Sequence, residues 1–349
     1  MHRPDPVLPP LVSRAAARDV GLSDRQITRR LATGEWRAVR RGLLLPARPA
    51  LAGPPQVLDL EMLAAVRSTG RDVAVAVAQA ARVWDLPRPL DGWGKPMLLA
   101  LSGPTRNQDD LCIRVAPWAD GDLVVLPDGL VVTSPGRTVA DCLRHLRPPD
   151  AVAVADRALR TGLVTRAEID ATLVRMKGWP GVVQARRLAA LADGRRESTL
   201  ESWSAVAFDD TGVPQPVVQV DIEDRDGPVG RVDFRWKGGL IGESDGRAKY
   251  LLRAAELAGA DADGLAQVLA EERERERRLR ATGANLVRWG PADVLVPART
   301  DRLAALIDRE MRDQRHRRVT GTARPAPLML EPSTGLRRFQ SSERYRPRA

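Results

Sequence analysis

The chain has few of the side chains from which zinc sites and disulfide frameworks are built. Its 349 residues include two cysteines, Cys112 and Cys142, and three histidines. The cysteines stand on apolar stretches without metal-ligand spacing, and the histidines are scattered along the chain. This pattern argues against both a zinc site and a disulfide framework. Cys142 and His145 have helical spacing, which we interpret as helix packing.

Long apolar runs are also absent. No run approaches the ~18 residues that a membrane helix needs, and the N-terminal sequence MHRPDPVLPP lacks the apolar segment of a signal peptide. We therefore expect a cytoplasmic protein without a membrane partner. The length exceeds that of one ordinary domain of roughly 100–200 residues, so two or three domains with linkers are expected.

Lysine is scarce as well, with four lysines among 55 basic residues, so arginine carries most of the positive charge. The net charge of +10 favours a nucleic-acid partner. Residues 312–349 contribute ten arginines against three acids, which leaves +3 for the preceding 311 residues. This segment is rich in proline, serine and arginine, and its composition predicts a disordered basic tail.

The N-terminal residues predict a helix, a tight turn, a second helix and a hairpin. Ser23 and Gln26 form a capping box at the start of the second helix, which ends at Gly34. Ile27 occupies its apolar face, and polar and basic side chains occupy the other. The strand-like segments EWRAVRRG and LLLPA then meet at an Arg-Gly turn, as in the wing of a winged helix.

The segment GLSDRQITRRLATGEWRAVRRGLLL resembles the N-terminal winged helix-turn-helix of AbiEi-type antitoxins, and departs from it at Leu44, where an aromatic residue is usual. A recognition helix needs polar and arginine side chains near its N-terminus, and a wing offers arginines to phosphates. The candidate DNA contacts are Asp24, Arg25, Thr28 and Arg29 on the helix, and Arg37, Arg40 and Arg41 in the hairpin. A solvated arginine face on a small interaction domain remains the alternative.

Residues 53–195 combine helical segments with several short strands. Within them, TSPGRTVAD resembles a signature of the middle domain of AbiEi-type proteins. Arg137 and Asp141 are one helical turn apart, and we interpret them as an ion pair that holds the helix start. No catalytic constellation is visible in this region.

From Arg196 onward the patterns predict the order αβββαβα. The segments DRDG and KGG are turn sequences, so three consecutive strands form a meander. Asp233 lies within the second strand, and Glu243 and Asp245 lie at the end of the third. Converging carboxylates are costly unless a cation neutralises them, and oxygen ligands favour Mg²⁺ or Mn²⁺. Such a site is typical of phosphodiester hydrolysis.

Residues 197–310 resemble the PD-(D/E)xK nuclease superfamily, and within it proteins similar to very-short-patch-repair endonucleases. The resemblance rests on VDF, ExDG and the helices TLES and EERERERRL. It implies that Glu201, Asp233 and Glu243 bind the metal and that Asp245 belongs to the catalytic set. The lysine expected two residues after the acid is replaced by Asp245, so Lys249 would either take over charge stabilisation or only contact a phosphate. Gly242 is a second oddity, because a β-branched residue would better support that strand.

The charged helix EERERERRL contains two acids on an otherwise apolar face, Glu272 and Glu276. We expect at least one of them to point toward the site. Arg275 lies off that face, where it meets either a phosphate or water; it is a further candidate DNA contact.

Two functions are consistent with these patterns. The first is a Mg²⁺-dependent DNA endonuclease; the second is an antitoxin-like regulator, with a toxin-operon partner, whose nuclease-like domain only binds DNA or a partner. The expected fold is multidomain α+β. Its predicted parts are a winged helix-turn-helix (1–52), an α+β middle domain (53–195), an αβββαβ restriction-endonuclease-like domain (196–311) and a disordered tail (312–349).

Overall fold

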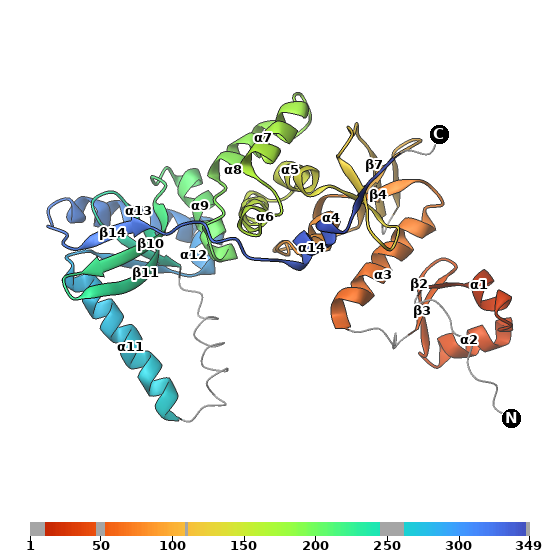
Figure 1. Ribbon diagram of the computed structural model, residues 1–349, viewed down its shortest axis with the longest axis horizontal. Helices are drawn as coiled ribbons and strands as arrows, with labels where there is room; N and C mark the ends of the chain where they lie inside the picture. Colours follow the sequence, from red (N-terminus) through yellow and green to blue (C-terminus); the bar gives the residue numbers. More distant parts are fainter. Residues whose placement is uncertain (1–10, 47–52, 109–110, 245–261, 347–349) are drawn as a thin grey trace. The chain divides into compact units, whose positions relative to one another are not determined.

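The computed structural model describes residues 11–46, 53–108, 111–244 and 262–346 (Figure 1). The chain forms two compact units, one containing Met1–Asp141 with Arg337–Ala349 and the other containing Cys142–Leu336. Both combine helices with a sheet, which confirms the general α+β fold.

The first part of the first unit contains the predicted helix, turn, helix and hairpin. Its elements are β1 (Val12–Ser13), α1 (Arg14–Asp19), α2 (Asp24–Ala32), β2 (Trp36–Arg40) and β3 (Leu43–Pro46), and the strands pair in the order β1-β3-β2. The Ser23–Gln26 capping box is present. Ile27 is fully buried and packs with Trp36 and Leu44, so the apolar face of α2 holds the helix on the sheet.

The rest of this unit is built on a seven-stranded mixed sheet, in the order β15-β8-β9-β4-β5-β7-β6. Its elements are α3 (Gly53–Ser68), β4 (Val73–Val75), α4 (Val77–Val83), β5 (Met97–Ala100), β6 (Arg106–Gln108), β7 (Leu111–Val115), β8 (Leu123–Val125), β9 (Val131–Thr133), α5 (Pro135–His145), α14 (Thr334–Gln340) and β15 (Glu343–Arg344). The division between the units falls within α5 and α14.

Arg137 has a structural role in α5, as predicted. Its guanidinium donates to Asp141 at 2.7 Å and to Asp122 at 3.0 Å, and all three side chains are buried. A buried arginine with carboxylate partners fixes the helix start against the preceding strands.

The second unit contains a helical part followed by the predicted αβββαβα order. Its elements are α6 (Pro148–Arg160), α7 (Arg166–Arg175), α8 (Val182–Leu191), α9 (Thr199–Thr211), β10 (Val217–Asp224), β11 (Gly227–Arg235), β12 (Ile241–Ser244), α11 (Ala262–Ala281), β13 (Leu286–Trp289), α12 (Pro291–Leu295), α13 (Pro297–Gln314) and β14 (Thr322–Pro325). The sheet order is β13-β12-β11-β10-β14, and only β12 and β13 pair in parallel. The strands predicted from the two turn sequences are confirmed.

Helix α6 belongs to this second unit, whereas the predicted boundary at residue 195 places it in the middle domain. A buried polar link joins α6 to the segment that begins α9. Asp156 accepts from Arg196 at 3.0 Å and from the Ser202 hydroxyl at 2.8 Å. Burial raises the pKa of Asp156, and the Arg196 guanidinium opposes this rise.

An aromatic cluster forms the core under the sheet. Phe208, Phe234, Trp236 and Trp289 have ring centroids 5.3 to 6.4 Å apart. Gly242 lies against two of these rings, since a Cβ there would be 2.6 Å from Trp289 and 2.7 Å from Trp236. The expectation that a β-branched residue suits this position is therefore wrong, because the indoles fill the space.

The prediction that residues 312–349 are disordered is also wrong for the part that the structure describes. Residues 322–325 form β14, which pairs with β10 through Val220↔Pro325 to Glu223↔Thr322. Residues 343–344 form β15 and pair with β8. Pairing with existing sheet edges satisfies this polar backbone, which composition alone does not reveal.

Within the described residues, no helix combines the length and the apolar character needed to cross a membrane.

Candidate functional site

The ladder between β11 and β12 ends at the two predicted acids Asp233 and Glu243. It contains the pairs Phe234↔Gly242 and Arg235↔Ile241. Beyond Gly242, the backbone N–H and hydroxyl of Ser244 both donate to Oδ2 of Asp233, at 2.9 and 2.7 Å. A side-chain carboxylate thus bridges the two strands and is held in a fixed position.

Glu201 is the most buried of the predicted acids, with 0% relative exposure. Its carboxylate accepts from the N–H of Glu197 at 2.9 Å, from the Ser198 hydroxyl at 2.8 Å and from Nε2 of Gln219 at 2.7 Å. Burial raises the pKa of Glu201 to about 7, and the negative charge of Asp233 adds to the rise, although these hydrogen bonds oppose it. Glu201 and Asp233 are therefore close enough to repel each other.

Gln219 is a site residue that the sequence did not indicate. It has φ of 50°, a left-handed conformation that is uncommon for a residue other than glycine. It lies in β10 between the register pairs Val218↔Phe234 and Val220↔Val232. This local distortion accompanies a side chain that is buried against Glu201, and strained backbone of this kind is often found at functional sites.

Glu243 is held by two arginines from different elements. Oε1 accepts from Nη2 of Arg275 on α11 at 2.6 Å, and Oε2 accepts from Nε of Arg288 on β13 at 3.0 Å. Both arginines also bind Glu272, and Arg288 additionally binds Glu276. Glu272 and Glu276 of α11 thus contact the arginines that hold Glu243, and that one of them points toward a metal site stays a prediction.

Arg288 is the second site residue that sequence reasoning missed. It lies between Val287 and Trp289 in β13 and pairs with Glu243 across the parallel ladder. The available signal is a single arginine within an otherwise apolar strand. Its significance depends on the register between two strands that are far apart in the sequence.

The predicted metal-binding set is only partly brought together. In residues 11–46, 53–108, 111–244 and 262–346, no three His, Cys, Asp or Glu side chains form a group that could hold a metal ion. The charge of Asp233 acts on Glu201, whereas Glu243 is bound to the arginines. Asp245 and Lys249 lie outside the described residues. Glu201 and Asp233 themselves fit a hard cation, because they offer oxygen donors whose mutual repulsion a cation would relieve.

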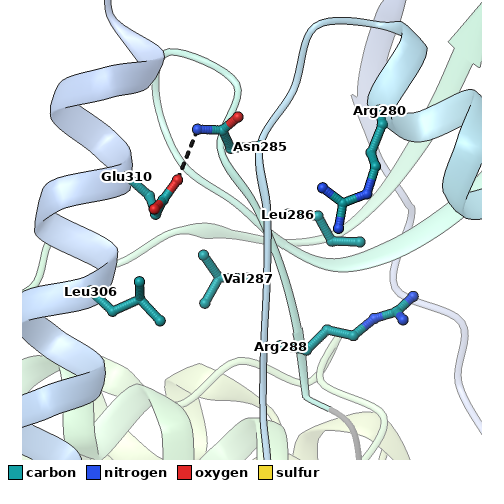
Figure 2. A pocket seen from close by; sticks show the side chains of 7 residues that line it. All are labelled: Arg280, Asn285, Leu286, Val287, Arg288, Leu306 and Glu310. Atoms are coloured by element: carbon teal, nitrogen blue, oxygen red, sulfur yellow. Dashed lines mark hydrogen bonds between the residues drawn. The ribbon is translucent and has the colours of Figure 1, made fainter.

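Two hollows lie beside β13. One, of about 340 Å³, is lined by Arg280, Asn285, Leu286, Val287, Arg288, Leu306 and Glu310. Figure 2 shows Leu306 and Glu310 on one side of the strand, with Arg280 and Arg288 on the other. The second, of about 330 Å³, shares Arg288 and Leu306 with the first and adds Arg299 and Arg302. Arginines therefore line both hollows next to the Glu243 contacts.

The predicted DNA contacts near the N-terminus lie on the surface of the other unit. Arg25, Thr28, Arg29, Arg37 and Arg41 are exposed, and Arg40 is half-buried. Asp24 forms an ion pair with Arg18 at 2.9 Å. The exposed face of α2 is thus basic and polar, as a DNA contact requires, and a solvated face would have the same arrangement.

No family model matches the chain. The uncharacterized proteins MT2308 and Rv2248 of Mycobacterium tuberculosis, from strains CDC 1551 / Oshkosh and ATCC 25618 / H37Rv, are each 40% identical over 108 residues. The match covers 31% of this chain and 40% of each relative, so the chain spans well under two thirds of these curated relatives.

A crystal structure of the RV2827C protein from Mycobacterium tuberculosis has 16% sequence identity and a TM-score of 0.36. That comparison covers 60% of this chain and 80% of the other. A similarity of this size carries no argument about fold or function. The resemblances to AbiEi-type antitoxins and to very-short-patch-repair endonucleases therefore stay predictions.

Proposed function

We propose that the protein binds DNA and that its second unit is a nuclease-like domain that hydrolyses phosphodiesters with a divalent metal ion. The observation that carries the proposal is the fully buried carboxylate of Glu201, which Gln219 holds, beside the partly buried Asp233 that bridges β11 and β12. Two carboxylates kept close together in a protein interior are costly, and a bound cation offsets that cost. The order αβββαβ around the pair supports the same proposal.

In this proposal Glu201 and Asp233 hold Mg²⁺ or Mn²⁺. The metal, when bound, lowers the pKa of a water molecule and neutralises charge on the scissile phosphate. Ser244 and Gln219 keep the two carboxylates in place. The exposed arginines of α2 and of the hairpin bind the duplex, in the manner of a winged helix.

One observation favours the second candidate, a DNA-binding regulator that does not cleave. Glu243 is already neutralised by Arg275 and Arg288, so this acid needs no metal for charge balance. In that case the fold serves DNA or a protein partner such as the product of a toxin operon, and the arginine network is purely structural.

Cleavage of supercoiled plasmid with Mg²⁺ or Mn²⁺ separates the candidates. We expect Asp233→Asn to abolish metal-dependent nicking while gel-shift binding of DNA persists. Asp221→Asn is the matched control, since Asp221 lies on the neighbouring strand and pairs only at the surface with Arg231. Equal nicking by the wild-type and Asp233→Asn proteins, or none by either, would exclude the nuclease.

A further inference from the structure

Two arginines surround one carboxylate at the edge of the proposed metal site. Arg275 and Arg288 approach Glu243 from α11 and β13 and bind one oxygen each. The Glu243 side chain is 12% exposed, whereas the arginine side chains are 23% and 29% exposed. The carboxylate is therefore enclosed, while both arginines remain accessible from solvent.

Other contacts hold the arginines in place independently of Glu243. Nη2 of Arg275 also donates to the carbonyl of Arg231 at 2.8 Å, and Nη1 binds Glu272 at 3.1 Å. Arg288 binds Glu272 at 3.0 Å and Glu276 at 2.9 Å. If Glu243 left, both guanidinium groups would keep partners that fix their positions.

The charges explain what can replace these contacts. Guanidinium groups bind carboxylate and phosphate oxygens with the same charge-assisted geometry. Removing one member of a partly buried ion pair is costly unless another charge of the same sign takes its place. A phosphodiester, with charge −1, can replace Glu243 at the arginines, and a divalent cation can replace the arginines at Glu243.

We infer that Arg275 and Arg288 form a phosphate-binding site that Glu243 occupies in the free protein, and that Glu243 exchanges them for the divalent cation when a DNA phosphodiester binds. This inference rests on the proposed function. Glu243 lies one residue from Ser244, whose N–H and hydroxyl bind Asp233, so the exchange brings it into the set predicted for the metal.

The exchange makes DNA and the cation bind cooperatively. The phosphodiester releases Glu243 for the cation, and the cation releases the two arginines for the phosphodiester. Each ligand must therefore raise the affinity of the protein for the other by the same factor. Arg288 lines both hollows beside β13, so an anionic chain in either hollow would meet one arginine of the proposed site, although Glu310 and Asp293 also line them; Figure 2 shows Arg288 and Glu310 in the first hollow.

The first test looks for a gain of DNA binding, and circular dichroism of the same sample checks that the variant is folded. Fluorescence anisotropy of a labelled duplex, without divalent ions, should show Glu243→Gln binding about tenfold more tightly than the wild-type protein. The neutral side chain releases the contacts of both arginines to Glu243, whereas their contacts to Glu272 and Glu276 remain. If Glu243→Gln binds DNA no more tightly than wild-type, the inference is overturned.

The coupling is measured by repeating the titration with Ca²⁺ at constant ionic strength. We expect Ca²⁺ to raise the DNA affinity of the wild-type protein by about tenfold, and to raise that of Arg275→Gln and Arg288→Gln by less than about twofold. Arg277→Gln is the matched control, because Arg277 is an exposed arginine of α11 whose ion pair is with Glu274. It should keep the full coupling.

Mn²⁺ binding, followed by the paramagnetic resonance of the free ion, distinguishes the two levels of the proposal. If Mn²⁺ binds to the wild-type protein and not to Asp233→Asn, but Arg275→Gln and Arg288→Gln keep the coupling to DNA, the metal site stands and the exchange is wrong. If Mn²⁺ binds to none of these proteins with or without DNA, both the proposed function and the exchange are wrong.

Discussion

The packing around Gly242 requires a residue without a side chain. Its backbone conformation does not require glycine. Gly242 lies in β12, and the rings of Trp289 and Trp236 occupy the space that its Cβ would need. The indole N–H of Trp289 donates to Ser204 at 2.8 Å, and that of Trp236 donates to the Pro214 carbonyl at 2.7 Å. Because both rings are anchored at their polar edges, neither is free to retreat from an added methyl group.

Gly242→Ala should therefore destabilise the second unit. We expect a loss of about 1–3 kcal/mol in the free energy of unfolding, the usual cost of overpacking a dense core. Urea unfolding followed by tryptophan fluorescence measures it directly. A change below about 0.5 kcal/mol, as at an ordinary surface position, would mean that the rings adapt.

The acids of the site differ in what the sequence reveals about them. Strand order and spacing predict Asp233 and Glu243, and the resemblance to the nuclease superfamily adds Glu201, on which the charge of Asp233 acts in the structure. The partners of Glu243 were not foreseen in full. Arg275 was expected to meet phosphate or water, and Arg288 was missed, because its contact depends on the register Glu243↔Arg288 between two separate strands.

The C-terminal segment, residues 312–346, is ordered through contacts with parts of the chain that are distant in sequence. Glu331 accepts from Arg157 at 2.6 Å and also from Arg160, both on α6. The hydrogen bond from Arg160 lowers the pKa of Glu331 to about 2, with Arg157 adding to the effect. This acid therefore fastens the segment that follows β14 to the helical part of the same unit.

The ion pair at Glu331 should weaken at low pH. Because the folded-state pKa lies below the ordinary carboxyl value, its stabilisation is complete above about pH 4.5 and is lost as the pH falls toward 2. The carboxylate is 43% exposed, so solvent screening limits the effect to about 1 kcal/mol.

Hydrogen exchange of the β14 amides tests this link. Glu331→Gln should increase exchange relative to wild-type near neutral pH, and the difference should vanish toward pH 2. Glu343→Gln on the same segment is the control, since no ion pair of Glu343 is present in the described residues. Unchanged exchange in Glu331→Gln at neutral pH would refute the role of this ion pair.

Helix α2 carries the predicted contacts to the duplex. If Arg25 and Arg29 contact phosphates, replacing either with alanine should weaken DNA binding for all sequences and lower the salt slope by about one. Arg309→Ala, which removes an exposed arginine of α13 paired with Glu310, is the control. Affinity and salt slope equal to wild-type in both α2 variants would support a solvated face.

Local chemistry predicted the order of elements better than their long-range partners. The turns DRDG and KGG and the Ser23 capping box each involve residues only a few positions apart, so the strands and the start of α2 follow from the sequence. The pairing of β14 with β10 joins residues about a hundred positions apart. Its proline- and arginine-rich sequence has the composition of a disordered segment. It is ordered as a strand because the edge of the sheet at β10 offers unpaired backbone groups to which it binds.

The whole chain combines two units with different parts in the proposed function. The first presents an exposed basic helix and hairpin, and the second contains the buried Glu201, the partly buried Asp233, and Glu243 with its two arginines. The positive charge is thus not only a property of a terminal tail. Several arginines instead form defined contacts to acids within the second unit.

The most direct test of the central claim is metal-dependent DNA cleavage by Glu201→Gln beside the wild-type protein. Glu201 is fully buried, so its side chain does not contact DNA from the surface, and the amide keeps nearly the same size. The account predicts that Glu201→Gln binds DNA like the wild-type protein and loses about 100-fold or more in cleavage rate, as when a catalytic electrostatic partner is removed. Cleavage at the wild-type rate would contradict it.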